Sequence, residues 1–269
     1  MAGQISVSKK STDNFLTKIP NVDSSISDKT SEIQEQGFCI LKEHFAVSLV
    51  NRCRLTFLTV FQKYLENNGH TPNRGTNRHF LPMPFEEPCF APEFFFDDKI
   101  LTIVKSILGD RIAADQWGCD VPLAGSDYQN VHVDYQRPLF YEFPDLQLPP
   151  YMLVMSFALT QITEQNGAIE LAPTTHCMTR EKAVKAVEKK KIEMLPICMD
   201  IGDVLIRHPW VLHRGTPNKT DTPRLLTTVR YVRNWYADNS REVCSIPPSV
   251  WKSLTTEQRN MLRFPVNVD

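Results

Sequence analysis

The sequence predicts an α+β fold in which helices come first and a β-rich core follows. Two segments with helical periodicity lie before residue 110. Short apolar runs separated by Gly, Pro and Asn come after them, at residues 152–160, 192–197, 203–207 and 225–232. Many short strands at this spacing favour a closed or sandwiched sheet. We therefore expect residues 110–235 to form a β-barrel or jelly roll buttressed by the N-terminal helices.

The chain is expected to form one domain behind a flexible N-terminal tail. Its 269 residues are 42% hydrophobic and 23% charged, and no Gly/Ser-rich linker or repeat divides them in the middle. Residues 1–30 are rich in Ser, Lys, Thr and Asp and have no continuous apolar stretch, which excludes a secretory signal. Residues 31–269 would then form the single domain, with structure beginning near Ile33.

Two helices are predicted before the β-rich core. After a strand-like run at residues 38–41, apolar residues recur at helical spacing from residue 47 to residue 65, and Gly69 ends the pattern. Residues 70–96 hold five of the 19 prolines and six of the 15 phenylalanines without a period, which indicates an irregular aromatic loop. The second helix is expected at residues 97–109, because Asp97 and Asp98 suit a helix N-terminus.

Charge and cysteine content narrow the classes of partner and compartment. The net charge is −1, from 30 basic and 31 acidic residues, so no overall field attracts nucleic acid or an anionic membrane, and no apolar run is long enough to span a bilayer. The basic run at residues 180–191 is expected to be a solvated helix face. Seven scattered cysteines without a CxxC pair suggest neither disulfides nor a zinc ribbon. A small-molecule partner and the reducing cytoplasm are therefore expected.

Three residues are candidate metal ligands. His132 and Asp134 are two apart, so on a strand both side chains would point to the same face. Taken alone, the pair would fit equally well a chance occurrence or two residues joined by a hydrogen bond. His213 lies beyond the run at 203–207 and can complete a set of two histidines and one carboxylate, which suits Fe(II) and O2. His176 and His208 compete with His213 for the third position.

One arginine after His213 is a candidate for binding a co-substrate. Arg224 lies eleven residues after His213, at the start of a predicted strand. A guanidinium can hold a carboxylate through two parallel hydrogen bonds, which suits the distal end of a dicarboxylate co-substrate. Alone, Arg224 would also fit a surface arginine beside Pro223.

Together these segments resemble the phytanoyl-CoA dioxygenase-like family of Fe(II)/2-oxoglutarate oxygenases, from about Ile33 to about Tyr236. The matching segments occur in the family's order, as 35–41, His132-x-Asp134, 166–176, Gly202-Asp203, 213–218 and Pro223-Arg224. The resemblance implies a double-stranded β-helix, a distorted jelly roll, with His132, Asp134 and His213 as iron ligands. It also implies that His176 is not a ligand, and Thr174 replaces the usual Gly of that segment.

The resemblance further implies the co-substrate site and the type of reaction. Arg224 matches the arginine that binds 2-oxoglutarate, and Gln129 or Asn130 resembles the amide that contacts its other carboxylate. Asp134 stands where some halogenating relatives have a small residue. We therefore expect O2-dependent oxidation of a small molecule, most simply hydroxylation but also desaturation or ring closure, with release of succinate and CO2.

Two other functions fit parts of this pattern. A cupin-like metal-dependent hydrolase or isomerase could use the same three ligands but has no use for Arg224. A catalytically silent binding protein could retain the fold. The organic substrate is expected to lie against the aromatic segments 72–96 and 135–151, and Arg137, Arg230 and Arg233 are candidate contacts for an anionic group on it.

Overall fold

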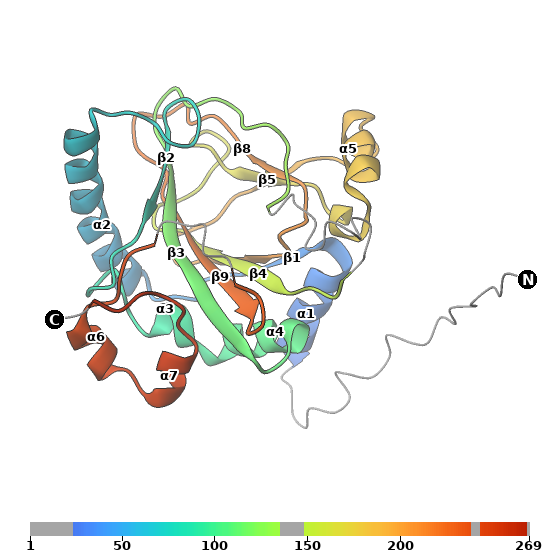
Figure 1. The fold of residues 1–269 in the computed structure, drawn as a ribbon. Helices are drawn as coiled ribbons and strands as arrows, with labels where there is room; N and C mark the ends of the chain where they lie inside the picture. The colour runs from blue at the N-terminus through green and yellow to red at the C-terminus, as the bar shows by residue number, and fades with distance from the viewer. Residues whose placement is uncertain (1–23, 135–147, 238–242, 268–269) are drawn as a thin grey trace, which may run out of the picture.

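Two antiparallel sheets packed face to face form the centre of the molecule (Figure 1). The computed structural model describes residues 24–134, 148–237 and 243–267. The large sheet contains, in spatial order, β1 (Phe38–Leu41), β7 (Val204–Arg207), β4 (Met152–Phe157), β9 (Leu226–Arg233), β3 (Ile112–Pro122) and β2 (Arg78–Pro82). The small sheet contains β6 (Leu195–Ile197), β5 (Ile169–Leu171) and β8 (His213–Gly215). This arrangement confirms the predicted jelly roll.

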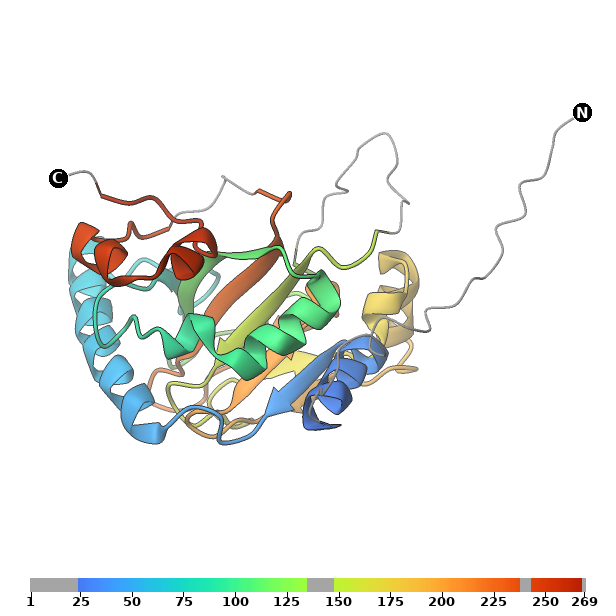
Figure 2. The same cartoon turned by 90° about the horizontal axis from the view of Figure 1, so that it is seen from below.

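Helices cover the outer face of the large sheet, and the small sheet faces its inner side (Figures 1 and 2). The N-terminal helices are α1 (Ser24–Gln36), α2 (Val47–Asn68), α3 (Glu93–Phe96) and α4 (Asp98–Leu108). The later ones are a 3₁₀ turn, η2 (Thr175–Cys177), and the helices α5 (Arg180–Glu188), α6 (Pro248–Ser253) and α7 (Thr256–Asn260). Both helices expected before the β core are confirmed as α2 and α4.

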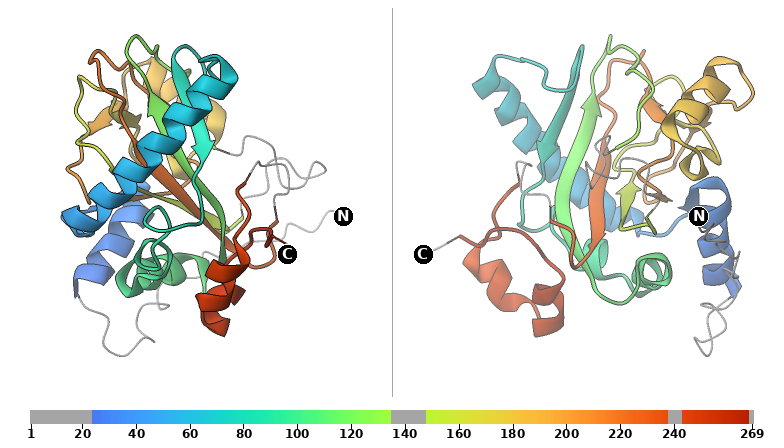
Figure 3. Two further views of the ribbon diagram at one scale, coloured as in Figure 1. Left: turned by 90° about the vertical axis from the view of Figure 1, so that its left-hand side faces the viewer. Right: turned by 45° about the vertical axis from the view of Figure 1, so that its right-hand side comes forward.

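The ends of α2 and α4 follow from local chemistry. Gly69 adopts a left-handed conformation, φ 58°, that stops α2, as its position predicted. Asp97 accepts a hydrogen bond from the Ile100 amide, 2.9 Å, at the start of α4. Phe61 of α2 then packs edge-on against His79 of β2 at 5.5 Å, and Figure 3 shows α2 running beside β2 and β3.

Alternation along the strands separates an apolar outer face from a functional inner face. On β4, Leu153, Met155 and Phe157 belong to the main hydrophobic core with the helices. The residues between them, Val154 and Ser156, line an inner cavity. The same core runs from Ile33 to Phe264, so α1 and the C-terminal segment pack on it.

An irregularity in β3 interrupts this alternation. The pairing with β9 shifts between Ala114 and Gln116, which leaves Asp115 as an extra residue. Asp115 binds the guanidinium of Arg230 through two hydrogen bonds of 2.6 and 2.7 Å, and Arg230 is completely buried. Arg230 is therefore an internal residue of the barrel.

Two expectations about secondary structure were wrong. Residues 24–30 are helical and not part of a tail, because Thr30 is buried and its hydroxyl contacts Ser106 at 3.0 Å. The segment 70–96 contains β2 and α3; β2 is an edge strand, where Pro82 removes no ladder hydrogen bond. Strands β3, β5 and β8 were not predicted.

The basic run at 180–191 includes α5, of which only Ala183 is buried, as expected of a solvated face.

Among the described residues, no helix is both long enough and apolar enough to cross a membrane.

A glycine before β7 ties the loop after β1 to the sheet. Gly202 has φ 91°, and a Cβ there would lie 2.3 Å from the carbonyl oxygen of Phe45. The Gly202 carbonyl accepts a hydrogen bond from the Phe45 amide, 3.0 Å, and Asp203 accepts one from the Glu43 amide, 2.8 Å. This turn has no room for a side chain.

We expect Gly202→Ala to lower the free energy of unfolding by about 3 kcal/mol, because it combines backbone strain with a clash against main chain. Gly69→Ala is the matched control: its φ is also positive, 58°, but no atom lies within 4 Å of the added Cβ. It should cost only about 1 kcal/mol. Urea unfolding measures both, and equal losses would contradict the packing argument.

Candidate metal centre

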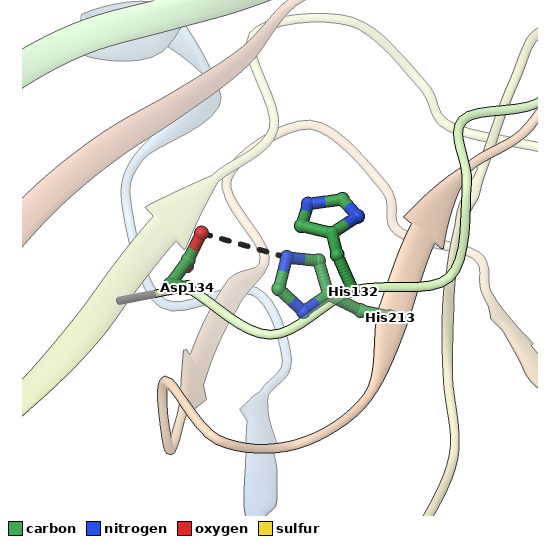
Figure 4. Close-up of side chains that lie close together, drawn as sticks. All are labelled: His132, Asp134 and His213. Atoms are coloured by element: carbon green, nitrogen blue, oxygen red, sulfur yellow. Dashed lines mark ion pairs between the residues drawn. The ribbon is translucent and has the colours of Figure 1, made fainter. Parts of the chain in front are cut away.

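His132, Asp134 and His213 converge at the inner face of the barrel (Figure 4). One ligand atom from each lies within 4.8 Å of the others. The main chain brings them together, since the His132 amide donates to the His213 carbonyl at 3.0 Å and the His213 amide donates to the His132 carbonyl at 2.9 Å. The two rings consequently lie 4.3 Å apart, centroid to centroid.

Both imidazoles are held with the same nitrogen turned toward the centre. Nδ1 of His132 lies 2.7 Å from the Asn130 carbonyl oxygen, and Nδ1 of His213 lies 2.9 Å from that of Val211. A carbonyl accepts only from a protonated nitrogen, so each Nδ1 carries a proton, and in a neutral imidazole Nε2 is then the nitrogen with the lone pair. Metal-binding histidines are commonly oriented by such a hydrogen bond on the other nitrogen.

The carboxylate of Asp134 is held by an arginine on β7. Nη2 of Arg207 lies 2.7 Å from Oδ2, while Oδ1 faces Nε2 of His213 at 3.7 Å. Burial alone would raise the pKa of Asp134, but the charge of Arg207 holds that pKa well below its ordinary value. Burial lowers the pKa of His213 to about 3. The centre thus offers an ionised carboxylate and, at His213, a neutral imidazole, which are the protonation states that a divalent metal requires.

Arg224 lies in the same cavity, toward its other end. It is 1% exposed, and its Nη2 binds Oδ2 of Asp120 at 2.8 Å while its Nε donates to the Gly167 carbonyl at 3.1 Å. Nη1 of Arg78 binds the same oxygen of Asp120 at 3.0 Å. Burial would raise the pKa of Asp120, but the charges of Arg224 and Arg78 lower it. Two buried guanidiniums therefore share one ionised carboxylate, and one positive charge remains uncompensated.

A cavity connects the two charged groups. The triad lines it together with Arg224, Gln129 and Arg207 and with inner-face residues of the large sheet, Gln116, Asp120, Val154, Ser156, Leu226 and Thr228. The cavity is therefore polar at both ends, and paired strands of the large sheet form one of its walls.

The two candidate amides differ in position. Gln129 lines the cavity, and its Oε1 accepts a hydrogen bond from the Gly215 amide at 2.9 Å. The Asn130 side chain is exposed, and it is the Asn130 carbonyl that contacts His132. The geometry thus favours Gln129 for contact with a bound molecule.

The competing histidines lie elsewhere. Nε2 of His176 lies 3.1 Å from the Gln34 carbonyl oxygen, and the His208 ring lies tilted beside the His176 ring, 5.1 Å from it centroid to centroid. Neither belongs to the cluster of possible metal ligands found among the described residues. Thr174, which replaces a glycine of the family pattern, adopts a left-handed conformation with φ 66°.

Other expected contacts are placed differently or fall outside the structure. Of the segment 72–96, Arg74 and Phe80 line the cavity. Residues 135–147, with Arg137, lie outside the described residues. Arg233 donates to the carbonyls of Pro150, 2.8 Å, and Ile107, 3.2 Å, so its role is structural.

Sequence reasoning missed Arg207 and Asp120. Asp120 lies in β3, which is buried along nearly its whole length, and Arg207 ends the apolar run of β7, so hydrophobic alternation did not mark either residue. Spacing along a strand was the available signal, because residues an even number apart share a face. Arg207 lies two residues after Leu205, and Asp120 lies four residues after Gln116.

Comparison with known proteins agrees with this arrangement. The family model described as phytanoyl-CoA dioxygenase matches residues 33–226, which is more than half of the chain. The chain belongs to the phytanoyl-CoA dioxygenase family. One curated relative is the dioxygenase lolE1 of Epichloe uncinata, which is 28% identical to this chain over 130 residues. That match covers 46% of this chain and 47% of the relative, so the chain matches about half of the relative's length.

Solved structures share the fold at low sequence identity. One is the non-heme alpha ketoglutarate dependent carbocyclase SnoK from nogalamycin biosynthesis, with a TM-score of 0.59 and 17% identity over 77% of this chain and 83% of that one. Another is the epimerase SnoN in complex with Fe3+, alpha ketoglutarate and nogalamycin RO, with a TM-score of 0.61 and 14% identity over 87% of this chain and 97% of that one. The jelly roll of this phytanoyl-CoA dioxygenase family member is thus shared with both.

The stability of the apoprotein should depend on pH through a buried histidine. Burial lowers the pKa of His208 to about 3, with the charges of His176 and Arg207 acting in the same direction. Because the folded-state pKa is below the unfolded value near 6.5, unfolding takes up a proton, and stability falls as the pH drops below about 6.5.

We expect His208→Asn to remove this dependence, so that the stability difference between wild type and variant changes by roughly 2 kcal/mol between pH 7 and pH 5. Chemical denaturation of metal-free protein at the two pH values measures it. His70→Asn, at an exposed position, is the control. Parallel profiles for wild type and His208→Asn would contradict the assignment.

Proposed function

We propose that this protein is an Fe(II)/2-oxoglutarate-dependent dioxygenase that oxidises a small molecule, most simply by hydroxylation, with release of succinate and CO2. The observation that carries the proposal is the pairing of two features in one cavity. A set of two histidines and one carboxylate lies at one end, and a buried, still partly uncompensated guanidinium pair lies at the other. A metal-dependent hydrolase needs the first feature only.

The three ligands suit Fe(II). Two neutral imidazole nitrogens and one carboxylate on a single face are the donor set of non-haem iron oxygenases, and they leave further coordination positions open. When bound, the iron supplies the activation of O2 coupled to decarboxylation of 2-oxoglutarate. His132, Asp134 and His213 would hold the metal without rearrangement of their own hydrogen bonds to Asn130, Arg207 and Val211.

Arg224 would bind the distal carboxylate of 2-oxoglutarate. Its guanidinium is fixed by Asp120 and the Gly167 carbonyl, so little side-chain entropy is lost on binding. Arg78 adds a second positive charge on the far side of Asp120. Gln129, held by the Gly215 amide, would offer its amide group to the carboxylate nearer the metal.

Replacing His213 should abolish both metal binding and turnover. We expect His213→Ala to weaken anaerobic Fe(II) or Co(II) binding by roughly 100-fold or more, because a lost ligand costs at least as much as a lost supporting hydrogen bond. Calorimetric titration measures the affinity, and oxygen and 2-oxoglutarate consumption measure turnover. His176→Ala is the control, since His176 lies outside the cluster. Wild-type metal affinity in His213→Ala would remove the assignment.

Replacing Arg224 should act on the co-substrate. We expect Arg224→Ala to raise the KM for 2-oxoglutarate roughly 100-fold, because two charge-assisted hydrogen bonds are lost, while metal affinity is retained. Arg214→Ala is the matched control: this neighbour of His213 pairs with Glu170 at 2.6 Å and does not line the cavity. An unchanged KM in Arg224→Ala would argue for a different co-substrate or for hydrolytic chemistry.

A further inference from the structure

Arg207 is a buried cation that reaches the cavity far from Arg224. Arg207 is the last residue of β7 and is 7% exposed. The strand registers place Arg207 opposite Val154, and Val154 opposite Arg230 of β9. Arg230 is six residues after Arg224, which corresponds to roughly 20 Å along an extended strand. The backbones of Arg224 and Arg207 therefore approach the cavity from opposite ends.

The hydrogen bonds of Arg207 are incomplete. Its Nη2 donates to Oδ2 of Asp134 at 2.7 Å, but its Nη1 is buried and has no hydrogen-bond partner among the described residues. Arg224 differs, since both its Nε and its Nη2 are paired. A buried N–H of a charged group that lacks an acceptor costs about 1–3 kcal/mol or more, so an acceptor is expected at Nη1 in the working protein.

Charge balance indicates the nature of that acceptor. In the metal-free protein, Arg207 and Asp134 compensate one another. With a divalent metal bound, the carboxylate of Asp134 and the nearer carboxylate of 2-oxoglutarate balance the metal, the distal carboxylate balances Arg224, and Asp120 balances Arg78. One buried positive charge then remains. Buried charges are rarely left without a partner, because desolvation is costly.

The remaining charge belongs at Arg207. Arg78 is satisfied by Asp120 and by the Thr216 carbonyl, 2.8 Å, and Arg224 is assigned to 2-oxoglutarate. Arg207, in contrast, borders the metal ligand and lines the part of the cavity formed by Val154 and Gln116, which belong to its own row across the sheet.

We propose that the organic substrate carries a carboxylate that accepts a hydrogen bond from Nη1 of Arg207. This inference rests on the proposed function. Arg207 would then have two tasks: Nη2 holds the oxygen of Asp134 that faces away from the metal site, and Nη1 binds the substrate. Since the two nitrogens belong to one guanidinium, the acid group docks beside the metal. The carbon that is oxidised consequently lies within a few bonds of the carboxylate.

The test compares binding of acids with that of their neutral counterparts. The probes are small carboxylic acids and amino acids, each paired with its primary amide, titrated anaerobically into protein loaded with Fe(II) and 2-oxoglutarate. For wild type we expect at least one acid to bind tenfold or more tightly than its amide, measured by calorimetry. Arg207→Gln should abolish this preference, and Arg207→Lys should retain part of it because the charge remains.

Controls separate this inference from its premises. Arg214→Gln should keep the preference for acids, because Arg214 lies outside the cavity. Metal and 2-oxoglutarate affinities are measured for each variant, and Arg207→Gln should bind 2-oxoglutarate within a few-fold of wild type. Wild-type protein that binds neither metal nor 2-oxoglutarate would refute the proposed function itself.

Three results would overturn the inference alone. The first is a panel in which no acid binds more tightly than its amide to wild-type protein that binds metal and 2-oxoglutarate. The second is an unchanged preference in Arg207→Gln. The third is a large loss of 2-oxoglutarate affinity in Arg207→Gln, which would assign Nη1 to the co-substrate.

Discussion

The pair of main-chain hydrogen bonds between His132 and His213 is the contact on which the centre depends. It joins β8 of the small sheet to the extended chain that follows β3, and it fixes both imidazoles without using either side chain. The Nδ1 atoms are then held by carbonyls of the same two segments, so the orientation of the rings follows from backbone geometry alone. The other ring nitrogen of each histidine is therefore left to bind a metal.

The large sheet forms the rest of the site, because one of its faces packs against the helices and the other lines the cavity. On β9, Val229 and Tyr231 pack into the outer core, whereas Leu226 and Thr228 face the cavity. The same strand also begins just after Arg224 and contains Arg230 on its inner face. Because helices cover the outer face, the strands are rigid, and charged groups buried on the inner face are held in fixed positions.

The sequence predicted helices α2 and α4, the jelly roll and the convergence of three candidate ligands, because each leaves a local or family-wide pattern. Helix α2 has a clear period and a terminal glycine, and His132 and Asp134 share a face by simple spacing. Strands β5 and β8 have three residues each, too few to show a period. Asp120 and Arg207 escaped notice because their partners, Arg224 and Asp134, are distant in sequence and are brought near only by the registers of the sheet.

The extra residue in β3 has a consequence for how this barrel can change length. On one side of Asp115, Trp117 and Cys119 pack outward; on the other, Ile112 and Ala114 do so, and Ala113 turns to the inner side. The bulge thus exchanges odd and even positions between the faces. Deleting Asp115 itself would close the bulge and leave both halves of the strand on their present faces, but it would also remove the carboxylate that binds Arg230. Deleting or inserting one residue in a regular part of this strand would instead turn the residues beyond it to the opposite face, so only at the bulge can the strand lose a single residue and keep both faces.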